Sequence, residues 1–175
     1  MTEWEGFFKA AGQYYVAGRY SAFAGFIPVT GNLFHHAIEM FLKGGLSKTG
    51  MSLADLKKLN HDLPDIWATF KDVCNGPNLN RFDPVITSLH RFEEIRYPDL
   101  IVQKGLTASI DILSQAGVNQ PKATYELCVQ DIDELVAQIF TTASANPWAF
   151  LSGRFYKQEA KQFLVKQNTV GALTN

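Results

Sequence analysis

Apolar residues recur along most of this chain at the three-, four- and seven-residue steps that place them on one face of an α-helix. One such stripe covers residues 4–22 and a second covers residues 34–42. Gly25 and Pro28 lie between the two stripes, and both residue types interrupt helices. The pattern therefore predicts two amphipathic helices joined by a short break.

Capping and proline signals mark the start of the following helices. Thr30 or Asn32 suits the N-cap of the second stripe, and Ser52 suits the N-cap of a short third helix. Asp62 and Asp83 each stand one or two residues before a proline, which is tolerated in a first turn because its missing N–H has no intrahelical partner there. Two more helices are therefore expected to begin at these aspartates.

The second half of the chain is less regular. Residues 99–125 show no long period, and two short apolar runs with a Lys-Gly turn signal between them predict a small β-hairpin near residues 100–112. A clear helical stripe returns at residues 132–143. We therefore expect an all-α fold, an up-and-down bundle of four to five helices over residues 1–145. An aromatic helical tail, residues 146–175, is expected to pack on the bundle or on a second subunit.

Composition places the chain among ordinary globular proteins. It has 175 residues, 46% of them apolar, and a formal net charge of −1, which gives no overall basic field to attract nucleic acid or anionic membrane. Cys74 and Cys128 lie far apart and form no CxxC pair, which is typical of reduced thiols. The N-terminus is acidic and no apolar run approaches membrane-spanning length. A cytoplasmic location is expected.

Three polar residues of the second helix follow an i, i+4, i+8 rule. His35, Glu39 and Lys43 therefore share one helix face beside the apolar stripe. Two interpretations are open: the face lines a binding groove that offers an acid and a base, or it is a solvated surface with a modest ion pair.

The sequence does not indicate a metal or cofactor site. His36 and Glu39 stand in the order His-x-x-Glu once only, whereas di-iron bundles use paired Glu-x-x-His motifs with further carboxylates. No nucleophile elbow, P-loop or dinucleotide fingerprint occurs. We therefore expect no cofactor and no metal, and local motifs do not indicate an enzyme.

His61 and Asp62 fall at a predicted helix start. The free N–H groups and the positive dipole end of such a start favour a phosphate or carboxylate nearby. Alternatively, Asp62 itself accepts from those donors as the N-cap, and His61 only completes the turn.

Arg96 is the most informative single residue. Tyr97 precedes Pro98, which predicts a helix end near Arg96, and a count of 100° per residue places Arg96 on the buried side of that helix with Phe92. A desolvated arginine needs an acceptor. Glu39, Asp99, an anionic ligand or the last carbonyls of its own helix are the candidates.

Three short motifs in order resemble the HEPN superfamily. They are the run Phe34–Lys43, the helix start Asn60-His61-Asp62-Leu63 and the turn Ile95-Arg96-Tyr97-Pro98. The resemblance covers about residues 5–145 and rests on the order of the motifs more than on any one of them. It implies an all-α bundle, often dimeric, that either cleaves RNA or binds a nucleotide or RNA without catalysis, commonly beside a nucleotidyltransferase.

The resemblance also implies where catalysis is expected. Family ribonucleases carry an Arg followed by His after four to six residues, and no arginine of this chain has a histidine at that interval. We therefore expect a non-catalytic module, a homodimer in which Glu39, Lys43, His61, Arg96 and Tyr97 hold the phosphate of a nucleotide or RNA, with a nucleotidyltransferase as partner. Two alternatives stay open. The first is a protein-interaction or antitoxin-like module that works through Trp148, Phe150, Phe155 and Tyr156. The second is a metal-independent ribonuclease that uses His61 or His90 with Arg96.

Overall fold

A computed structural model describes residues 1–96, 99, 102–103, 107–113, 123–151, 162 and 164–174. Its longest helices are α1 (Glu3–Phe23), α2 (Ile27–Lys48), α4 (Leu63–Cys74), α5 (Asp83–Phe92) and α7 (Val129–Thr142). The shorter elements are α3 (Leu53–Lys58), the 3₁₀ turns η1 (Leu79–Phe82) and η2 (Glu94–Arg96), the strands β1 (Ala108–Asp111) and β2 (Tyr125–Cys128), and the helices α8 (Pro147–Leu151) and α10 (Gly171–Thr174).

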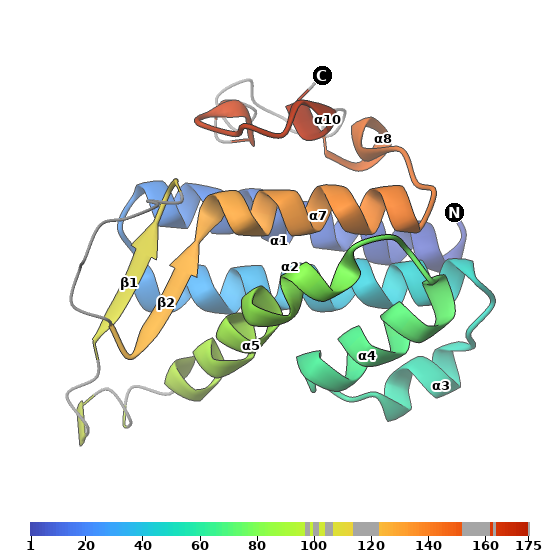
Figure 1. Cartoon of the computed structure of the whole chain (residues 1–175), viewed down its shortest axis with the longest axis horizontal. Helices are drawn as coiled ribbons and strands as arrows, with labels where there is room; N and C mark the ends of the chain where they lie inside the picture. Colours follow the sequence, from blue (N-terminus) through green and yellow to red (C-terminus); the bar gives the residue numbers. More distant parts are fainter. Residues whose placement is uncertain are drawn as a thin grey trace.

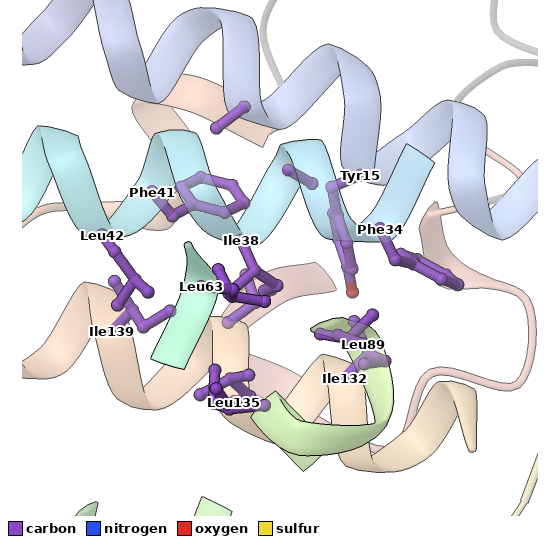
Figure 2. Close-up of a cluster of buried hydrophobic side chains, with 14 of the residues drawn as sticks. Tyr15, Phe34, Ile38, Phe41, Leu42, Leu63, Leu89, Ile132, Leu135 and Ile139 are labelled. Atoms are coloured by element: carbon purple, nitrogen blue, oxygen red, sulfur yellow. The ribbon is translucent and has the colours of Figure 1, made fainter. Parts of the chain in front are cut away.

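The long helices form the bundle that the periodicity predicts. α1 and α2 run side by side in opposite directions, α7 packs along them, and α3, α4 and α5 cover the far side of α2 (Figure 1). Apolar side chains from five helices meet between these elements and are fully buried (Figure 2). They include Tyr15, Phe34, Ile38, Phe41, Leu42, Leu63, Leu89, Ile132, Leu135 and Ile139. The all-α bundle is thus confirmed.

The start of α2 differs from the expectation. The helix begins at Ile27 with Pro28 in its first turn, and its N-cap is Phe26, so neither Thr30 nor Asn32 caps it. Pro28 is a start signal here because a proline in the first turn removes no intrahelical hydrogen bond. Thr30 Oγ1 instead donates to the Phe26 carbonyl at 2.9 Å.

The predicted caps of α3 and α4 are confirmed. Ser52 accepts from the backbone N–H of Asp55, and Asp62 Oδ1 accepts from the N–H of Asp65 at 3.0 Å. Each side chain satisfies one of the four N–H groups that a helix start leaves without a partner.

We expect Asp62→Ala to lower the free energy of unfolding by about 1 kcal/mol, because the Asp65 N–H loses its acceptor. Urea denaturation followed by far-UV circular dichroism measures the change. Asp62→Asn keeps a side-chain oxygen at the cap and is expected to lose much less. Equal losses in the two variants would show that the cap is not the cause.

A small strand element occurs in the expected part of the chain, but with a different pairing. β1 overlaps the second run of the predicted hairpin, residues 109–112, and it pairs in parallel with β2, with Ala108 opposite Tyr125. Of the first run, Val102 is helical, and Leu100 and Ile101 lie outside the described residues. The Lys104-Gly105 turn signal precedes β1 in the sequence, so it does not join this pair, and parallel strands need a longer connection than a tight turn.

The described part of the C-terminal tail covers one side of the bundle, next to α1 and α7 (Figure 1). The Phe150 ring lies 5.7 Å from that of Trp4 and 5.4 Å from that of Phe8. Leu151, Leu164 and Leu173 are buried, whereas Trp148 is exposed. Phe155 and Tyr156 of the interaction hypothesis lie outside the described residues.

A buried polar network joins this tail to the bundle. Tyr15 and Arg19 of α1 both donate to the carboxylate of Asp133 on α7, and Arg19 also donates to the carbonyl of Lys166. Asn168 Nδ2 lies 3.4 Å from the Tyr15 hydroxyl and donates to it. Arg19 and Asp133 are completely inaccessible to solvent, so these bonds replace water for both charges.

The cysteines and the apolarity of the helices were also addressed by the sequence. Cys74 and Cys128 are free thiols, both half-buried. Among the described residues, no helix combines the length and apolarity needed to cross a membrane.

Candidate functional site

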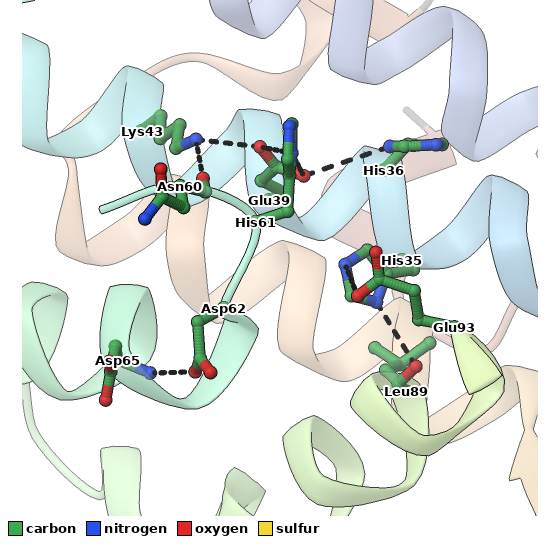
Figure 3. Close-up of polar contacts among 10 residues, drawn as sticks. All are labelled: His35, His36, Glu39, Lys43, Asn60, His61, Asp62, Asp65, Leu89 and Glu93. Atoms are coloured by element: carbon green, nitrogen blue, oxygen red, sulfur yellow. Dashed lines mark hydrogen bonds and ion pairs between the residues drawn. The ribbon is translucent and has the colours of Figure 1, made fainter. Parts of the chain in front are cut away.

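The polar face of α2 is covered, not solvated. His35, Glu39 and Lys43 are only 3%, 5% and 8% exposed, so the interpretation of this face as a solvated surface stripe is wrong. The chain before α4 and the end of α5 lie over this face. The Asn60 carbonyl accepts from Lys43, and the Leu89 carbonyl lies 3.3 Å from His35 Nδ1 (Figure 3).

Glu39 lies at the centre of the contacts on this face. Its Oε1 accepts from Lys43 Nζ at 2.7 Å, and His61 Nδ1 lies 3.0 Å from Oε1 and 3.1 Å from Oε2 (Figure 3). His36 Nδ1 lies 3.8 Å from Oε2. Burial alone raises the pKa of Glu39, but the hydrogen bonds and charges of Lys43 and His61 outweigh burial and bring this pKa below its ordinary value. The carboxylate is therefore ionised at neutral pH.

Lys43 is held by protein groups. Two of its three ammonium protons reach Glu39 and the carbonyl of Asn60. Asn60 has a φ of 49°, a left-handed conformation that asparagine tolerates better than most residues, and its carbonyl accepts from the lysine. Lys43 therefore serves first as the partner of Glu39.

His61 contacts the buried Glu39 carboxylate while most of its side chain is exposed to solvent. One ring edge touches Glu39, yet the side chain is 70% exposed. It turns toward α2 rather than toward the start of α4, where Asp62 caps the helix. The alternative in which Asp62 caps α4 is thus confirmed, and the exposed part of the imidazole faces solvent beside Glu39.

Arg96 does not lie on the buried side of a helix. α5 ends at Phe92, and the 3₁₀ turn η2 follows, so the 100° count no longer applies. The preceding residue, Ile95, is buried, whereas Arg96 is exposed. Tyr97, the other residue of this motif predicted to bind ligand, lies outside the described residues, and Asp99 is exposed.

His36 connects Arg96 with Glu39. Burial lowers the pKa of His36, Glu39 opposes this, and the charges of His35, Arg96 and His61 lower it further. The charges of these groups therefore act together on one imidazole. We call His36, His61 and Arg96 the cationic rim; all three are at least partly exposed, His36 by 31%.

All four histidines of the chain gather in this region. The ring of His35 lies 5.9 Å from that of His36 and 6.3 Å from that of His90. His35 Nε2 lies 3.8 Å from a carboxylate oxygen of Glu93. Sequence reasoning considered His36 only for a metal site and His90 only for the ribonuclease alternative, and it did not consider Glu93. The sequence did contain a signal for His36, because the adjacent His35 and His36 both lie on the helix face of Glu39.

Within the described ranges, no group of three or more His, Cys, Asp or Glu side chains is arranged to hold a metal ion. The arrangement instead offers hydrogen-bond donors and positive charge around a carboxylate that is already neutralised. Groups of this kind hold phosphate or carboxylate groups of a ligand.

Comparison with known proteins gave no match: no protein-family model fits the chain, and neither a curated protein nor a solved structure resembles it significantly.

Proposed function

We propose that this chain is a non-catalytic, HEPN-like module that binds the phosphate of a nucleotide or RNA at the cationic rim of His36, His61 and Arg96. One observation carries the proposal. His36 and His61, both at least partly exposed, approach Glu39, whose negative charge is already neutralised by Lys43, and the charge of exposed Arg96 acts on His36. An incoming phosphate therefore meets donors and positive charge instead of an unpaired carboxylate. Arg96 offers two parallel N–H groups to phosphate oxygens, and the histidines offer one each.

The resemblance to HEPN domains adds the biological setting of the proposal. We infer a cytoplasmic homodimer that acts beside a nucleotidyltransferase. Lys43 and Glu39, which the sequence suggested as ligand contacts, act here mainly as a buried pair that holds His61 in place.

Isothermal titration calorimetry with ATP and with a short single-stranded RNA tests the proposal. Arg96→Ala and His61→Ala are each expected to weaken binding about tenfold, which corresponds to about 1.4 kcal/mol. Arg81→Ala is the matched control, because Arg81 is an exposed arginine that pairs with Glu134 on α7 at 3.7 Å, away from the rim. Binding that is absent, or that Arg81→Ala weakens equally, would rule the proposal out.

Binding is also expected to depend on pH. Because burial holds the pKa of His36 below its ordinary value, this imidazole is largely neutral at neutral pH and gains its charge as the pH falls. Affinity for phosphate is therefore expected to rise as the pH falls below about 6.5, the ordinary pKa of histidine, and His36→Asn is expected to flatten that rise.

Metal-independent RNA cleavage is a second candidate function, favoured by one contact. His36 and His61 approach the same oxygen of Glu39, so two partly exposed imidazoles lie together near Arg96 and provide an acid and a base. Cleavage of labelled RNA in EDTA, lost in both His36→Ala and His61→Ala, would support this function over simple binding. Intact RNA after incubation with the unmodified protein would exclude it.

A further inference from the structure

A small apolar pocket adjoins the site. It lies between α1, α2 and α3 and has a volume of about 170 Å³. Its lining consists of Phe7, Met40, Leu53 and Leu56 together with Glu39, Lys43 and Lys57. Most of the surface that it exposes is apolar, and three of its seven lining residues are charged.

The pocket and the cationic rim share a boundary. Glu39 and Lys43 line the pocket, and the same Glu39 carboxylate contacts His61 and His36 of the rim. A ligand with an apolar ring in the pocket therefore reaches the rim past this ion pair. Lys43 contributes its remaining ammonium proton at that point, where it can donate to a ring nitrogen or a carbonyl of the ligand.

The size of the pocket limits what it holds. Pockets that enclose a whole drug-sized ligand measure about 300–1,000 Å³, so this one holds a single ring system and leaves the rest of the ligand outside. Phe7 and Met40 provide an aromatic ring and a polarizable thioether, both of which favour contact with a flat π-system.

We propose that this pocket takes the base of a mononucleotide whose phosphate lies on the cationic rim. This inference rests on the proposed function and names the ligand of the same site. The base packs against Phe7 and Met40, its polar edge meets Lys43, and the ribose passes Glu39 toward His61. An RNA chain is the competing ligand, and the experiment below separates the two.

Calorimetry on the full chain with four nucleoside 5′-monophosphates (AMP, GMP, UMP and CMP) and with ribose 5-phosphate provides the test. At least one monophosphate is expected to bind about tenfold more tightly than ribose 5-phosphate, because only the nucleotide places a ring in the pocket. Leu53→Trp, at an exposed position of the pocket wall, is expected to reduce that nucleotide to the affinity of ribose 5-phosphate and to leave ribose 5-phosphate binding unchanged.

Val73→Trp is the matched control. Val73 is similarly exposed, lies on α4 and does not line the pocket, so the added indole is expected to change neither affinity. Because both positions are exposed, neither substitution is expected to unfold the protein. Thermal melting of both variants verifies this.

The outcomes distinguish this inference from the proposed function. One outcome is that ribose 5-phosphate binds, Arg96→Ala weakens that binding about tenfold, and no monophosphate binds more tightly. In that case phosphate binding at the cationic rim is supported and the base-pocket inference is wrong. If no phosphorylated compound binds, the proposed function itself fails. If a short RNA binds in preference to every monophosphate and Leu53→Trp has no effect on it, the ligand is an RNA chain and the pocket inference is overturned.

Discussion

Asp133→Ala is expected to lower the free energy of unfolding by about 3–5 kcal/mol. The substitution leaves the Arg19 guanidinium inside the bundle with the Lys166 carbonyl as a remaining acceptor, and it removes the acceptor of the Tyr15 hydroxyl. Burial raises the pKa of Asp133, and Arg19 and Tyr15 offset only part of that effect. Burying the Asp133 carboxylate therefore costs free energy, and Arg19 and Tyr15 need it as their hydrogen-bond acceptor. Urea denaturation measures the loss.

Two further variants determine whether the pair is the cause. Glu134→Ala alters the adjacent residue of α7, which forms a surface ion pair with Arg81, and is expected to cost at most about 1 kcal/mol. A double replacement, Arg19→Met with Asp133→Leu, removes both charges and is expected to recover much of the stability that Asp133→Ala loses. If Asp133→Ala lowers the free energy of unfolding no more than Glu134→Ala does, the buried Arg19–Asp133 pair is not important for stability.

Glu39→Ala is expected to lower the free energy of unfolding by about 3 kcal/mol, because Lys43 then keeps its buried charge with the Asn60 carbonyl as its remaining acceptor. The matched control is Asp55→Ala. Asp55 and Lys58 lie 2.7 Å apart, the same distance as Glu39 and Lys43, but their side chains are 53% and 76% exposed. Asp55→Ala is therefore expected to cost much less stability than Glu39→Ala. Similar losses in both variants would mean that burial does not strengthen the Glu39–Lys43 pair.

The stability that Glu39 provides is also expected to vary with pH. Since the pKa of Glu39 in the folded protein lies below its ordinary value, this contribution is complete above the pKa of the unfolded chain. It is lost as the pH falls through the lower pKa of the folded state. The difference in unfolding free energy between the unmodified protein and Glu39→Gln should therefore shrink between neutral pH and about pH 3. A difference that stays constant over that range would contradict the assignment.

Local signals in the sequence predicted most of the bundle. Asp62 and Ser52 cap their helices as expected, because a cap depends on the side chain and the next three residues alone. Pro28 was misjudged because a proline marks either a break or a first turn, and the packing of α1 against α2 selects between them. The partner of β1 was not predictable, since strand pairing across a dozen or more residues leaves no local pattern.

The site was predicted only in part, for a related reason. The helix period placed His35, Glu39 and Lys43 on one face, but the segments that cover this face come from residues 60–61 and from α5. Arg96 was misplaced because a 3₁₀ turn replaced the last turn of α5. The buried pair of Arg19 and Asp133 did have a signal: each charge sits at a core position of its helical stripe, and the two have opposite signs.

The gathering of all four histidines around Glu39 has a spectroscopic consequence. The chain contains no histidine elsewhere, so every imidazole resonance in a proton–nitrogen NMR spectrum of the unmodified protein comes from this one region. Selective labelling of histidine alone would then report tautomer, protonation and ligand contact at the site without assignment of the backbone. The same resonances would distinguish a ligand that touches exposed His61 from one that disturbs buried His35.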